Sequence, residues 1–520
     1  MLTDLELSHV EPAELAAGLS VARAQKVAVF IVAYNAEAHI EETIRRIPQP
    51  LVEHLAAIFL IDDSSTDSTV GKTKDLKSQL PILKVFSTPY NQGYGGNQKI
   101  GYSYAISQGF DIVALLHGDG QYAPEVLPRL LAPFAEPQVA AVFGSRMMLR
   151  GTARKGGMPL YKRIGNRILT VLENLLMRSD LSEWHSGYRA YRTSFLARVP
   201  FRYNTGGFHF DTQVIVQFLA SGFKIREVPI PTYYGDEICR VEGIPYAIRC
   251  VATVVHYLTT RLELFYHPRY DLEYPHNRYS FKRAPDTVHQ WVLSREFRQG
   301  ETVVDLGCAN GELAEALHQR GADVVGVDER APDRDFLCGF MEYNLDSRFA
   351  DAVLARFARQ VDTVVALDVL EHLVDVNAGV REVHAMLKSG GRLVASTANI
   401  AFLPLRLMLL FGQFNYGRRG ILDMTHKRLL TLGSFRRLLV AEGFRIDQIR
   451  GFGPPIRDML GDTRLLRTLD RLLARFARVW PRLFAYQILV EATRIDSLED
   501  VVGLTVGTPR RTTTDPSNRL

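Results

Sequence analysis

Short apolar runs alternate with amphipathic stretches through the first part of the chain. Runs typical of β-strands are separated by polar, helix-like segments such as "EAHIEETIRRI" at 37–47. Strands are predicted over residues 27–34, 56–63, 82–88 and 111–116. This alternation predicts a parallel sheet with helices on both faces, and the pattern blurs through residues 150–240.

The alternation stops and then restarts near Gly300. The segment "FYHPRYDLEYPHNRYSFKRAP" (265–285) has three prolines and no clear period, so it is predicted to connect two domains. Beyond it, a helix is predicted over 312–321, and strands over 301–307, 323–329, 361–368 and 391–397. The two blocks share no motif, which indicates a fusion of two α/β domains rather than a repeat.

These patterns predict the domain boundaries. Residues 1–25 are expected to be a weakly structured lead-in, and residues 26–240 the first domain. An amphipathic helix and linker over 241–284 lead to a second domain over 285–495. The tail, 496–520, is polar and expected to be disordered at its end.

Composition narrows the class of protein. Apolar residues make up 47% and charged residues 23% of 520 residues, as in ordinary globular chains. A net charge of +5 suits anionic substrates or a membrane surface, and it is too weak to indicate nucleic acid. The four cysteines form no CxxC pair, so neither a disulfide framework nor a zinc site is indicated. With no signal-peptide pattern and no spanning apolar run, a cytoplasmic protein is expected, at most peripheral on the membrane.

Three predicted strands end in residues suited to holding a ligand. The first ends at Ala33 and Tyr34, and the second ends at Asp62 and Asp63. Carboxyl ends of neighbouring parallel strands form one crevice, where carboxylates can accept from a base and a ribose and Tyr34 can stack. Capping of the following helix is an equally good explanation of the paired acids.

A third strand end, "HGDGQ" (117–121), is predicted to face the same crevice. Asp119, with His117 or Gln121, could hold Mg²⁺ or Mn²⁺ against a diphosphate, because these ions prefer oxygen ligands. A turn role for Asp119 in Gly-Asp-Gly is the alternative.

Six segments in order resemble an inverting family-two glycosyltransferase of the dolichol- and polyprenol-phosphate sugar synthase branch. They are "VFIVAYNAE", "FLIDDSSTDST", "HGDGQYAPE", "FGSRMM", "SGYRAYR" and "HFDTQVIVQFLASGFKIREVPIPTYY". The resemblance covers about residues 26–240. It implies a GT-A fold, a UDP- or GDP-linked sugar donor and a polyprenyl phosphate or glycan acceptor.

The same resemblance implies roles for individual residues. Arg146 would lie near the transferred sugar or the acceptor phosphate, and Arg163 and Arg189 would bind the acceptor's anionic head. The nucleoside would be held by Ala33, Tyr34, Glu37, Asp62 and Asp63, and the metal and diphosphate by Asp119 and Gln121.

His117 departs from the family pattern, which has an acid at this position. Imidazole can still ligate Mn²⁺. A phosphate acceptor is already ionised and needs no strong base, whereas a sugar hydroxyl does. Asp211 of "FHFDTQ" is the candidate base in that case, with a structural role as the alternative.

The second block opens with a strand, a glycine-rich turn and a helix start in "VVDLGCANGELAEAL". Gly307 and Gly311 allow close backbone approach to a ligand at the helix N-terminus. The spacing is neither the dinucleotide G-x-G-x-x-G nor a P-loop. Asp328 ends the next strand, where an acid takes ribose hydroxyls.

With "DVLEHL", "LKSGGRLVAST" and "AYQILVEA", this block resembles class I S-adenosylmethionine-dependent methyltransferases over about residues 285–495. The resemblance implies a Rossmann-like fold. His372 or His426 could accept a proton from the methylated hydroxyl, or make structural hydrogen bonds instead. Cofactor contacts would come from Asp305, Gly307, Cys308, Gly311, Asp328, Asp346 and Asp368.

Two amphipathic stretches could meet a membrane. "RLLRTLDRLLARFARVWPRLF" (464–484) has an arginine stripe and an apolar side, which suits an anionic lipid surface or packing between domains. Residues 244–266 offer the same two alternatives.

The sequence therefore predicts a bifunctional enzyme. A nucleotide sugar would donate its sugar to an acceptor, most simply a polyprenyl phosphate, and S-adenosylmethionine would methylate a related hydroxyl. Two rivals stay open: a saccharide-extending enzyme, and an inactive nucleotide-sugar-binding module attached to a methyltransferase.

Overall fold

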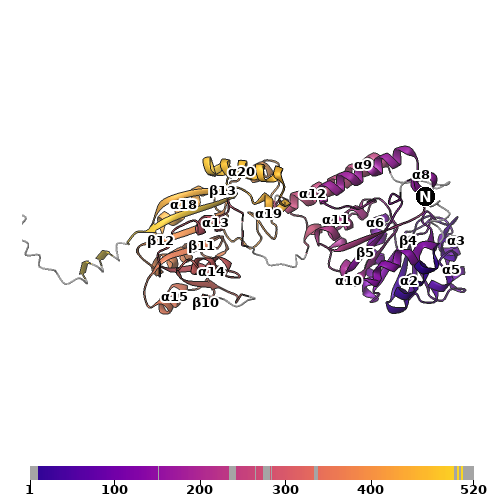
Figure 1. The fold of residues 1–520 in the computed structure, drawn as a ribbon, viewed down its shortest axis with the longest axis horizontal. Helices are drawn as coiled ribbons and strands as arrows, with labels where there is room; N and C mark the ends of the chain where they lie inside the picture. Colours follow the sequence, from indigo (N-terminus) through magenta and orange to yellow (C-terminus); the bar gives the residue numbers. More distant parts are fainter. Residues whose placement is uncertain are drawn as a thin grey trace, which may run out of the picture. The chain divides into compact units, whose positions relative to one another are not determined.

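The computed structural model describes residues 10–149, 151–232, 242–263, 265–272, 281–282, 284–332, 338–496, 501–502 and 505–506, without the side chains of Lys155 and Asp458. Most of the predicted tail, part of the predicted linker and the first nine residues lie outside these ranges. The chain forms two compact units, Met1–Thr260 with His267–Pro275, and Arg261–Tyr266 with His276–Leu520. Each has its own sheet (Figure 1).

The first unit is built on a seven-stranded sheet of order β3-β2-β1-β4-β6-β5-β7. Its strands are β1 (Val27–Ala33), β2 (Ala57–Asp62), β3 (Leu83–Ser87), β4 (Ile112–His117), β5 (Val139–Ser145), β6 (Arg189–Arg192) and β7 (Lys224–Pro229). The sheet is parallel except for β6, which runs antiparallel to both β4 and β5. The sequence "RAYR" has no apolar run, so this inserted strand was not predicted.

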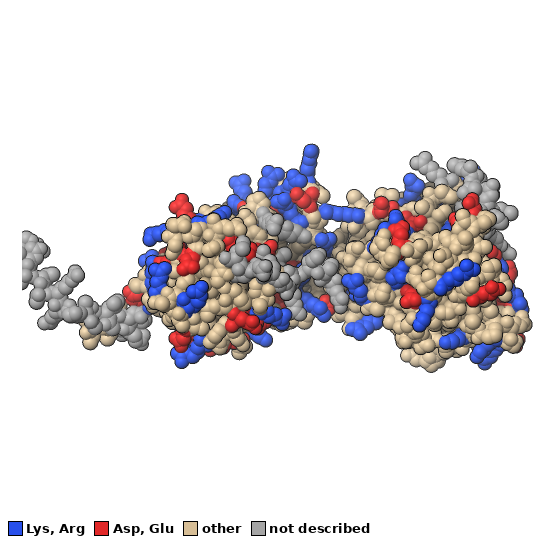
Figure 2. Space-filling model, turned by 60° about the horizontal axis from the view of Figure 1, so that its bottom comes forward, with Lys and Arg blue, Asp and Glu red and all other residues tan. Residues whose placement is uncertain are grey.

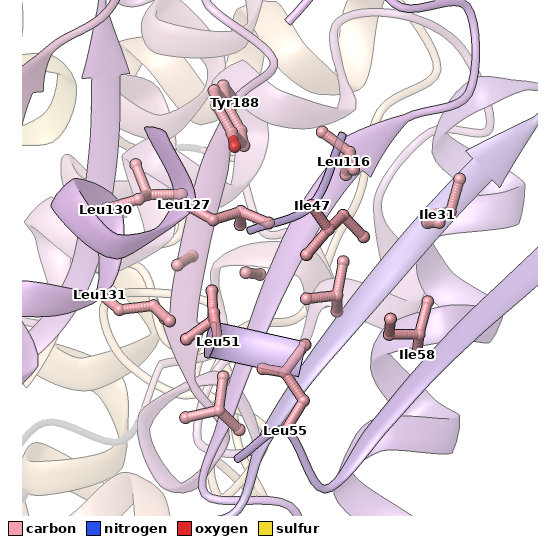
Figure 3. Close-up of a cluster of buried hydrophobic side chains, with 14 of the residues drawn as sticks. Ile31, Ile47, Leu51, Leu55, Ile58, Leu116, Leu127, Leu130, Leu131 and Tyr188 are labelled. Atoms are coloured by element: carbon pink, nitrogen blue, oxygen red, sulfur yellow. The ribbon is translucent and has the colours of Figure 1, made fainter. Parts of the chain in front are cut away.

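Both faces of this sheet are covered. Alternate residues of β1 enter different cores, Val29 and Ile31 on one face and Phe30 on the other. The first core packs against α2 (Pro12–Ala24), α3 (Ile40–Arg45), α4 (Gln49–Val52) and α7 (Leu127–Leu131), as Figure 3 shows for part of it. The second packs against α6 (Tyr94–Ser107), α11 (Phe210–Ala220) and α12 (Gly243–Arg261).

Residues 12–24, predicted to be weakly structured, form helix α2, so that prediction is wrong. Arg129 on α7 is paired with Glu14 at 2.9 Å. Gly18 lies so close to Pro128 that a Cβ atom would come within 2.5 Å of its carbonyl oxygen. Tertiary contacts rather than local periodicity therefore fix this helix.

The second unit is also built on a seven-stranded sheet, of order β10-β9-β8-β11-β12-β14-β13. Its strands are β8 (Thr302–Leu306), β9 (Asp323–Asp328), β10 (Gly339–Glu342), β11 (Val361–Leu367), β12 (Leu387–Ala398), β13 (Phe444–Phe452) and β14 (Gln487–Arg494). Only β14 runs antiparallel to its neighbours. The helices on one face are α15 (Phe349–Phe357), α16 (Val376–Met386) and α18 (Leu432–Ala441), and those on the other α13 (Val288–Leu293) and α14 (Glu312–His318).

Helix α20 (Arg464–Val479) is attached to this second sheet through small residues. Only Ala474 and Ala477 are buried along it. A Cβ atom on Gly451 of β13 would lie 2.3 Å from the Ala477 carbonyl oxygen, so helix and strand are in close backbone contact. Leu465, Leu472 and the arginines of the helix are exposed, and Arg478 pairs with Asp286.

Candidate functional site

Three strand ends meet at one edge of the first sheet. Ala33 of β1 is in register with Asp62 of β2, and Val32 with His117 of β4. The predicted nucleotide residues and the "HGDGQ" segment therefore lie side by side, as expected for a switch point in a mostly parallel sheet.

The paired acids at the end of β2 also shape the loop that follows. Asp62 accepts from the Ser65 amide at 3.0 Å and from its hydroxyl. Asp63 accepts from the Gln92 amide at 2.7 Å and from the Thr88 hydroxyl at 3.1 Å. These contacts stabilise the loops that follow β2 and β3 and do not cap the next helix, α5 (Thr69–Lys77). Both hydrogen bonds to Asp63 fall on Oδ1, so Oδ2 can accept from a ligand.

Glu37 and Tyr34 lie beside this loop. Glu37 accepts from the Ser68 amide at 3.0 Å, and its own amide donates to Asp67 at 3.1 Å. Tyr34 is 41% exposed at the end of β1, which leaves surface for stacking. The first two strand ends are therefore tied together by side chains of the 65–69 segment.

Asp119 is exposed just beyond β4. Its Oδ1 accepts from the backbone amide of Gln121 at 3.0 Å. The turn between these two residues depends on Gly120, whose φ is +74°. The carboxylate is held in place and still accessible, which is the arrangement that a hard divalent cation requires.

His117 faces inward rather than toward solvent. Its Nε2 lies 3.2 Å from the Tyr94 hydroxyl, which donates to Asp211 Oδ2 at 2.9 Å. Gln98 donates to the other Asp211 oxygen at 3.2 Å. Burial lowers the pKa of His117, so the ring is neutral near pH 7. Burial, with Asp211 adding to it, raises the pKa of Tyr94, which keeps the phenol a donor.

This His117–Tyr94–Asp211 chain of hydrogen bonds joins three segments that are far apart in the sequence. Tyr94 begins α6 and was not among the predicted site residues, although it lies in the glycine-rich stretch "NQGYGGN". A Cβ atom on Gly187 of "SGYR" would lie 2.6 Å from His117 Nε2, so this motif packs directly on the chain. Asp211 has both oxygens engaged and is 6% exposed.

Arg146 forms a buried ion pair that no local sequence pattern indicates. Its Nε donates to Glu183 at 3.0 Å, and its backbone amide donates to the same carboxylate at 2.7 Å. Burial acts to raise the pKa of Glu183, but Arg146 lowers it below its ordinary value. The guanidinium is therefore engaged in a buried ion pair instead of facing a sugar.

Arg189 and Arg163, the two predicted acceptor residues, have opposite surroundings. Arg189 is 1% exposed, and its guanidinium donates to the carbonyl oxygens of Ser186 and Trp184, both at 2.7 Å. The structure thus does not bring Arg189 to a surface where an acceptor could reach it. Arg163 is half-buried on α9 (Leu160–Met177), a helix considered below.

In the second unit, the glycine-rich turn leads from β8 into α14. Gly307 has φ +67° and Gly311 φ +73°, conformations that favour glycine. A Cβ atom on Gly307 would lie 2.4 Å from Val369, so the turn packs against the segment that follows β11. A pocket at this turn is lined by Phe281, His289, Asp305, Gly307, Asn310 and Leu313, among others.

Asp305 is buried at the base of this pocket. Its Oδ2 has no hydrogen-bond partner among the described residues. Burial, and then the neighbouring Asp328, raises the pKa of Asp305 to about 7. Asp328 itself accepts from the Ala309 amide at 2.9 Å, which links the ends of β8 and β9. Cys308 is buried beside them, and burial raises the pKa of its thiol.

The other predicted cofactor residues lie at the ends of β10 and β11. Asp346 accepts from the Val374 amide at 2.7 Å. Asp368 has φ +54° and accepts from the Ser396 hydroxyl at 2.8 Å and from Gln487.

The two predicted histidines come together, although they are far apart in the sequence. The rings of His372 and His426 lie 4.7 Å apart, centroid to centroid, in an edge-to-face arrangement. His372 Nδ1 is 3.0 Å from the Thr425 hydroxyl, and His426 Nδ1 is 3.0 Å from the Ile421 carbonyl oxygen. Burial lowers the pKa of His426, with His372 adding to the effect.

Family models match both units. Residues 28–199 match a model described as glycosyl transferase family 2, and residues 276–449 match one described as a methyltransferase domain. The chain therefore combines a GT-A-type glycosyltransferase domain with a Rossmann-like methyltransferase domain, and it is a transferase on both counts. This confirms the predicted fold class and the predicted fusion.

Named relatives cover each part separately. A UDP-N-acetylglucosamine–dolichyl-phosphate N-acetylglucosaminyltransferase from Methanococcus voltae is 26% identical over 220 residues, 40% of this chain and 86% of that protein. An undecaprenyl-phosphate mannosyltransferase from Micrococcus luteus is 25% identical over 206 residues, 39% and 82% of the two chains. A ubiquinone biosynthesis O-methyltransferase from Pseudomonas entomophila is 35% identical over 114 residues, 21% of this chain and 49% of that protein. The chain thus spans about half of that methyltransferase.

Among solved structures, glucosyl-3-phosphoglycerate synthase from Mycobacterium tuberculosis, in complex with Mn²⁺, UDP and phosphoglyceric acid, is similar with a TM-score of 0.38. Its sequence is 19% identical, and the match covers 48% of this chain and 83% of that one.

Proposed function

We propose that the first unit transfers a sugar, with inversion, from a UDP- or GDP-linked donor to a polyprenyl phosphate at a membrane surface. The second unit would methylate a hydroxyl of a related glycan or lipid with S-adenosylmethionine. The observation that carries the acceptor assignment is an apolar stripe on the solvent side of α9. The named relatives that act on dolichyl or undecaprenyl phosphate support it.

Helix α9 is apolar on the side where a surface helix is normally polar. Its exposed apolar residues recur every three or four positions, which places them on one side of the helix. Ile168 is 61% and Leu175 74% exposed. The stripe consists of Leu160, Tyr161, Ile164, Ile168, Val171 and Leu175.

Basic residues border this stripe. Arg163 and Arg167, one turn apart, follow one edge of the stripe, as in helices that lie on anionic lipid. The hydrophobic pattern is blurred through residues 150–240, and an amphipathic sequence does not tell which side of a helix faces the protein. No helix among the described residues is long and apolar enough to cross a bilayer.

Helix α20 of the second unit has the same character. Leu465, Leu469, Leu472, Phe476 and Val479 form an exposed apolar stripe. Arginines 464, 467, 471, 475 and 478 run beside it, and Figure 2 shows basic side chains gathered over this part of the unit. Because only two alanines are fully buried along α20, the membrane interpretation of 464–484 gains support over packing between domains.

For transfer to a phosphate, the chain needs positioning more than a base. The acceptor oxygen forms a bond to the anomeric carbon while the bond to the diphosphate oxygen breaks on the opposite side. An ionised phosphate attacks without losing a proton, so the engagement of both Asp211 oxygens is compatible with this acceptor. Asp119 and Gln121 would hold a divalent cation, which supplies positive charge to the departing diphosphate. Tyr94 would keep His117 and Asp211 fixed beside it.

For methyl transfer, the turn from Gly307 to Gly311 and the unpartnered Oδ2 of Asp305 suit S-adenosylmethionine. The buried carboxylate would face a positively charged group of the cofactor, and Asp328 would accept from its ribose. His372 or His426 would take the proton from the hydroxyl, because both rings lie together beyond β11.

The raised pKa of Asp305 predicts a pH-dependent affinity for S-adenosylmethionine. A cationic ligand favours the carboxylate over the neutral acid, so affinity should rise about tenfold from pH 6 to pH 8. Below pH 7, binding should release a proton, measurable by calorimetry in buffers of different ionisation enthalpy. Asp305→Asn should weaken binding and abolish the rise. Asp351→Asn, on the exposed side of α15, should keep it, and an unchanged pH profile in Asp305→Asn would contradict the assignment.

The two apolar stripes predict binding to anionic vesicles. Ile168→Ser with Leu175→Ser in α9, or Leu472→Ser with Phe476→Ser in α20, should each weaken co-sedimentation at least about tenfold, because each pair removes side chains worth more than 1 kcal/mol of burial. Val440→Ser, an exposed apolar residue of α18, is the matched control. Equal binding by all variants would contradict a membrane role for these helices.

The proposed reaction is tested by incubating the full chain with UDP- and GDP-sugars, Mn²⁺ or Mg²⁺, and polyprenyl phosphate, followed by mass spectrometry of the lipid. We expect a glycosylated lipid phosphate, and a methylated product when S-adenosylmethionine is added. Extension of a saccharide without a lipid product would favour the saccharide-extending rival. No turnover of any donor, with S-adenosylmethionine still used, would leave the first unit a binding module.

A further inference from the structure

We propose that the first unit holds a structural zinc-class ion between Glu173, His185 and Cys250. These residues come from α9, from the loop before β6, and from α12. Their ligand atoms all lie within 4.8 Å of one another. The site is separate from the strand-end crevice and independent of the proposed glycosyl transfer.

The site is enclosed. The side chains of Glu173 and His185 are 0% and 7% exposed, and Cys250 is buried. Glu173 Oε1 has no hydrogen-bond partner among the described residues, and Oε2 faces His185 Nε2 without the alignment of a good hydrogen bond. Nε2 and Glu173 Oε2 are 3.1 Å apart. A buried carboxylate is costly unless a positive charge compensates it, and here that charge is either a protonated His185 or a bound cation.

Surrounding residues orient two of the three ligands. The Tyr246 hydroxyl lies 3.0 Å from His185 Nδ1, which leaves Nε2 directed at Glu173. The Thr212 hydroxyl donates to Cys250 Sγ at 3.3 Å, a contact that stabilises a thiolate. Metal-bound histidines characteristically have their second ring nitrogen held in this way.

The donor set selects the ion. One thiolate, one imidazole and one carboxylate suit Zn²⁺, whereas Mg²⁺ and Mn²⁺ prefer oxygen alone. A divalent cation balances the thiolate and the carboxylate, so the buried site becomes neutral. Binding displaces the thiol proton to solvent. Bonds of about 2.0–2.3 Å in a tetrahedral site set the ligand atoms roughly 3.3–3.6 Å apart, so the widest separation, at most 4.8 Å, shortens by about 1 Å while the 3.1 Å between Nε2 and Oε2 changes little. The fourth position would go to water.

Such an ion would brace α9, the helix with the exposed apolar stripe. Glu173 lies on the side of α9 opposite Ile164 and Ile168. A cross-link to α12 and to the loop before "SGYR" would therefore hold the helix while its outer side contacts lipid. No sequence motif could reveal the site, because its ligands are separated by 12 and 65 positions.

The test is metal analysis of the full chain, purified without chelator and dialysed to remove weakly held ions. We expect close to one equivalent of zinc per chain, lost in Cys250→Ser and in Glu173→Gln but kept in Cys338→Ser. Reconstitution of the apo-protein with Co²⁺ should produce a sulfur-to-cobalt charge-transfer band in wild type and in Cys338→Ser. The band must be absent from Cys250→Ser.

Two results would overturn the site. Wild-type protein without zinc that also gives no cobalt–sulfur band would show that Glu173 and His185 form only an ion pair. Zinc retained by Cys250→Ser at the wild-type level would place the ion elsewhere. The zinc content and the cobalt band of the wild-type protein can be measured even if the variants do not fold. Neither depends on donor turnover, so failure of the proposed glycosyl transfer would be distinguishable from failure of the zinc site.

Discussion

Asp119→Asn is expected to lower the rate of glycosyl transfer at least about 100-fold, the usual loss when one pre-placed charge at a reacting group is removed. The carboxylate is exposed at the edge formed by β1, β2 and β4, and the Gln121 amide fixes its orientation. The asparagine side chain keeps the size and the Oδ1 contact but loses the negative charge with which Asp119 would hold a divalent cation. Initial rates at saturating donor, with Mn²⁺ varied, measure the effect.

Two further variants make this result specific. Asp75→Asn, on the exposed side of α5 (Thr69–Lys77), should be indistinguishable from wild type. His117→Asn should raise the Mn²⁺ requirement much less than Asp119→Asn, because His117 Nε2 is directed at Tyr94. Equal losses in His117→Asn and Asp119→Asn would instead make the imidazole a metal ligand. Full activity in Asp119→Asn would contradict a metal role for this carboxylate.

Glu183→Gln is expected to destabilise the first unit by about 3–5 kcal/mol, the range found when one partner of a buried ion pair is removed. The side chains of Arg146 and Glu183 are 8% and 0% exposed. The substitution leaves the Arg146 guanidinium buried without its counter-charge. Urea unfolding followed by Trp184 fluorescence, with Trp291 and Trp480 replaced by phenylalanine, reports on this unit.

The matched control is a half-exposed ion pair in the same unit. Arg46 and Glu125 are 2.7 Å apart with side chains 35% exposed, so Glu125→Gln should cost less than about 1 kcal/mol. The double variant Arg146→Met with Glu183→Leu should recover part of the stability, because the unpaired charge is gone. A Glu183→Gln loss as small as that of Glu125→Gln would show that water reaches the pair.

The side-chain partners of Arg146 and Arg189 could not be predicted from the sequence. Apolar periodicity located β1 to β4, β8, β9 and β11 within one or two residues, because a strand buried on both faces must be apolar throughout. It did not predict β5, β7, β10 or β13. The acids at strand ends followed directly. The partners of the arginines did not, since Glu183 lies 37 positions from Arg146 and no local pattern joins them.

Helix α9 shows a second limit. The sequence specifies an amphipathic helix, but only the packed structure tells that its polar side, with Glu173 and Asn166, faces the protein. The His117–Tyr94–Asp211 chain was invisible for the same reason: its members come from β4, α6 and α11. The residue types at the strand ends could be predicted from the sequence. The side chains that they contact could not, because those contacts depend on the tertiary fold.

The small-residue attachment of α20 has a consequence for how this chain can change. Ala474, Ala477 and Gly451 hold the helix through close backbone contact. The exposed leucines of α20 therefore contribute little to folding. The apolar stripe can therefore change, or be redesigned, one leucine at a time with little penalty in stability, whereas Arg467 and Arg478 also form ion pairs with Asp462 and Asp286. Substitutions at Gly451, in contrast, would detach the whole helix. Variation should therefore be frequent at the exposed positions of α20 and rare at Gly451, Ala474 and Ala477.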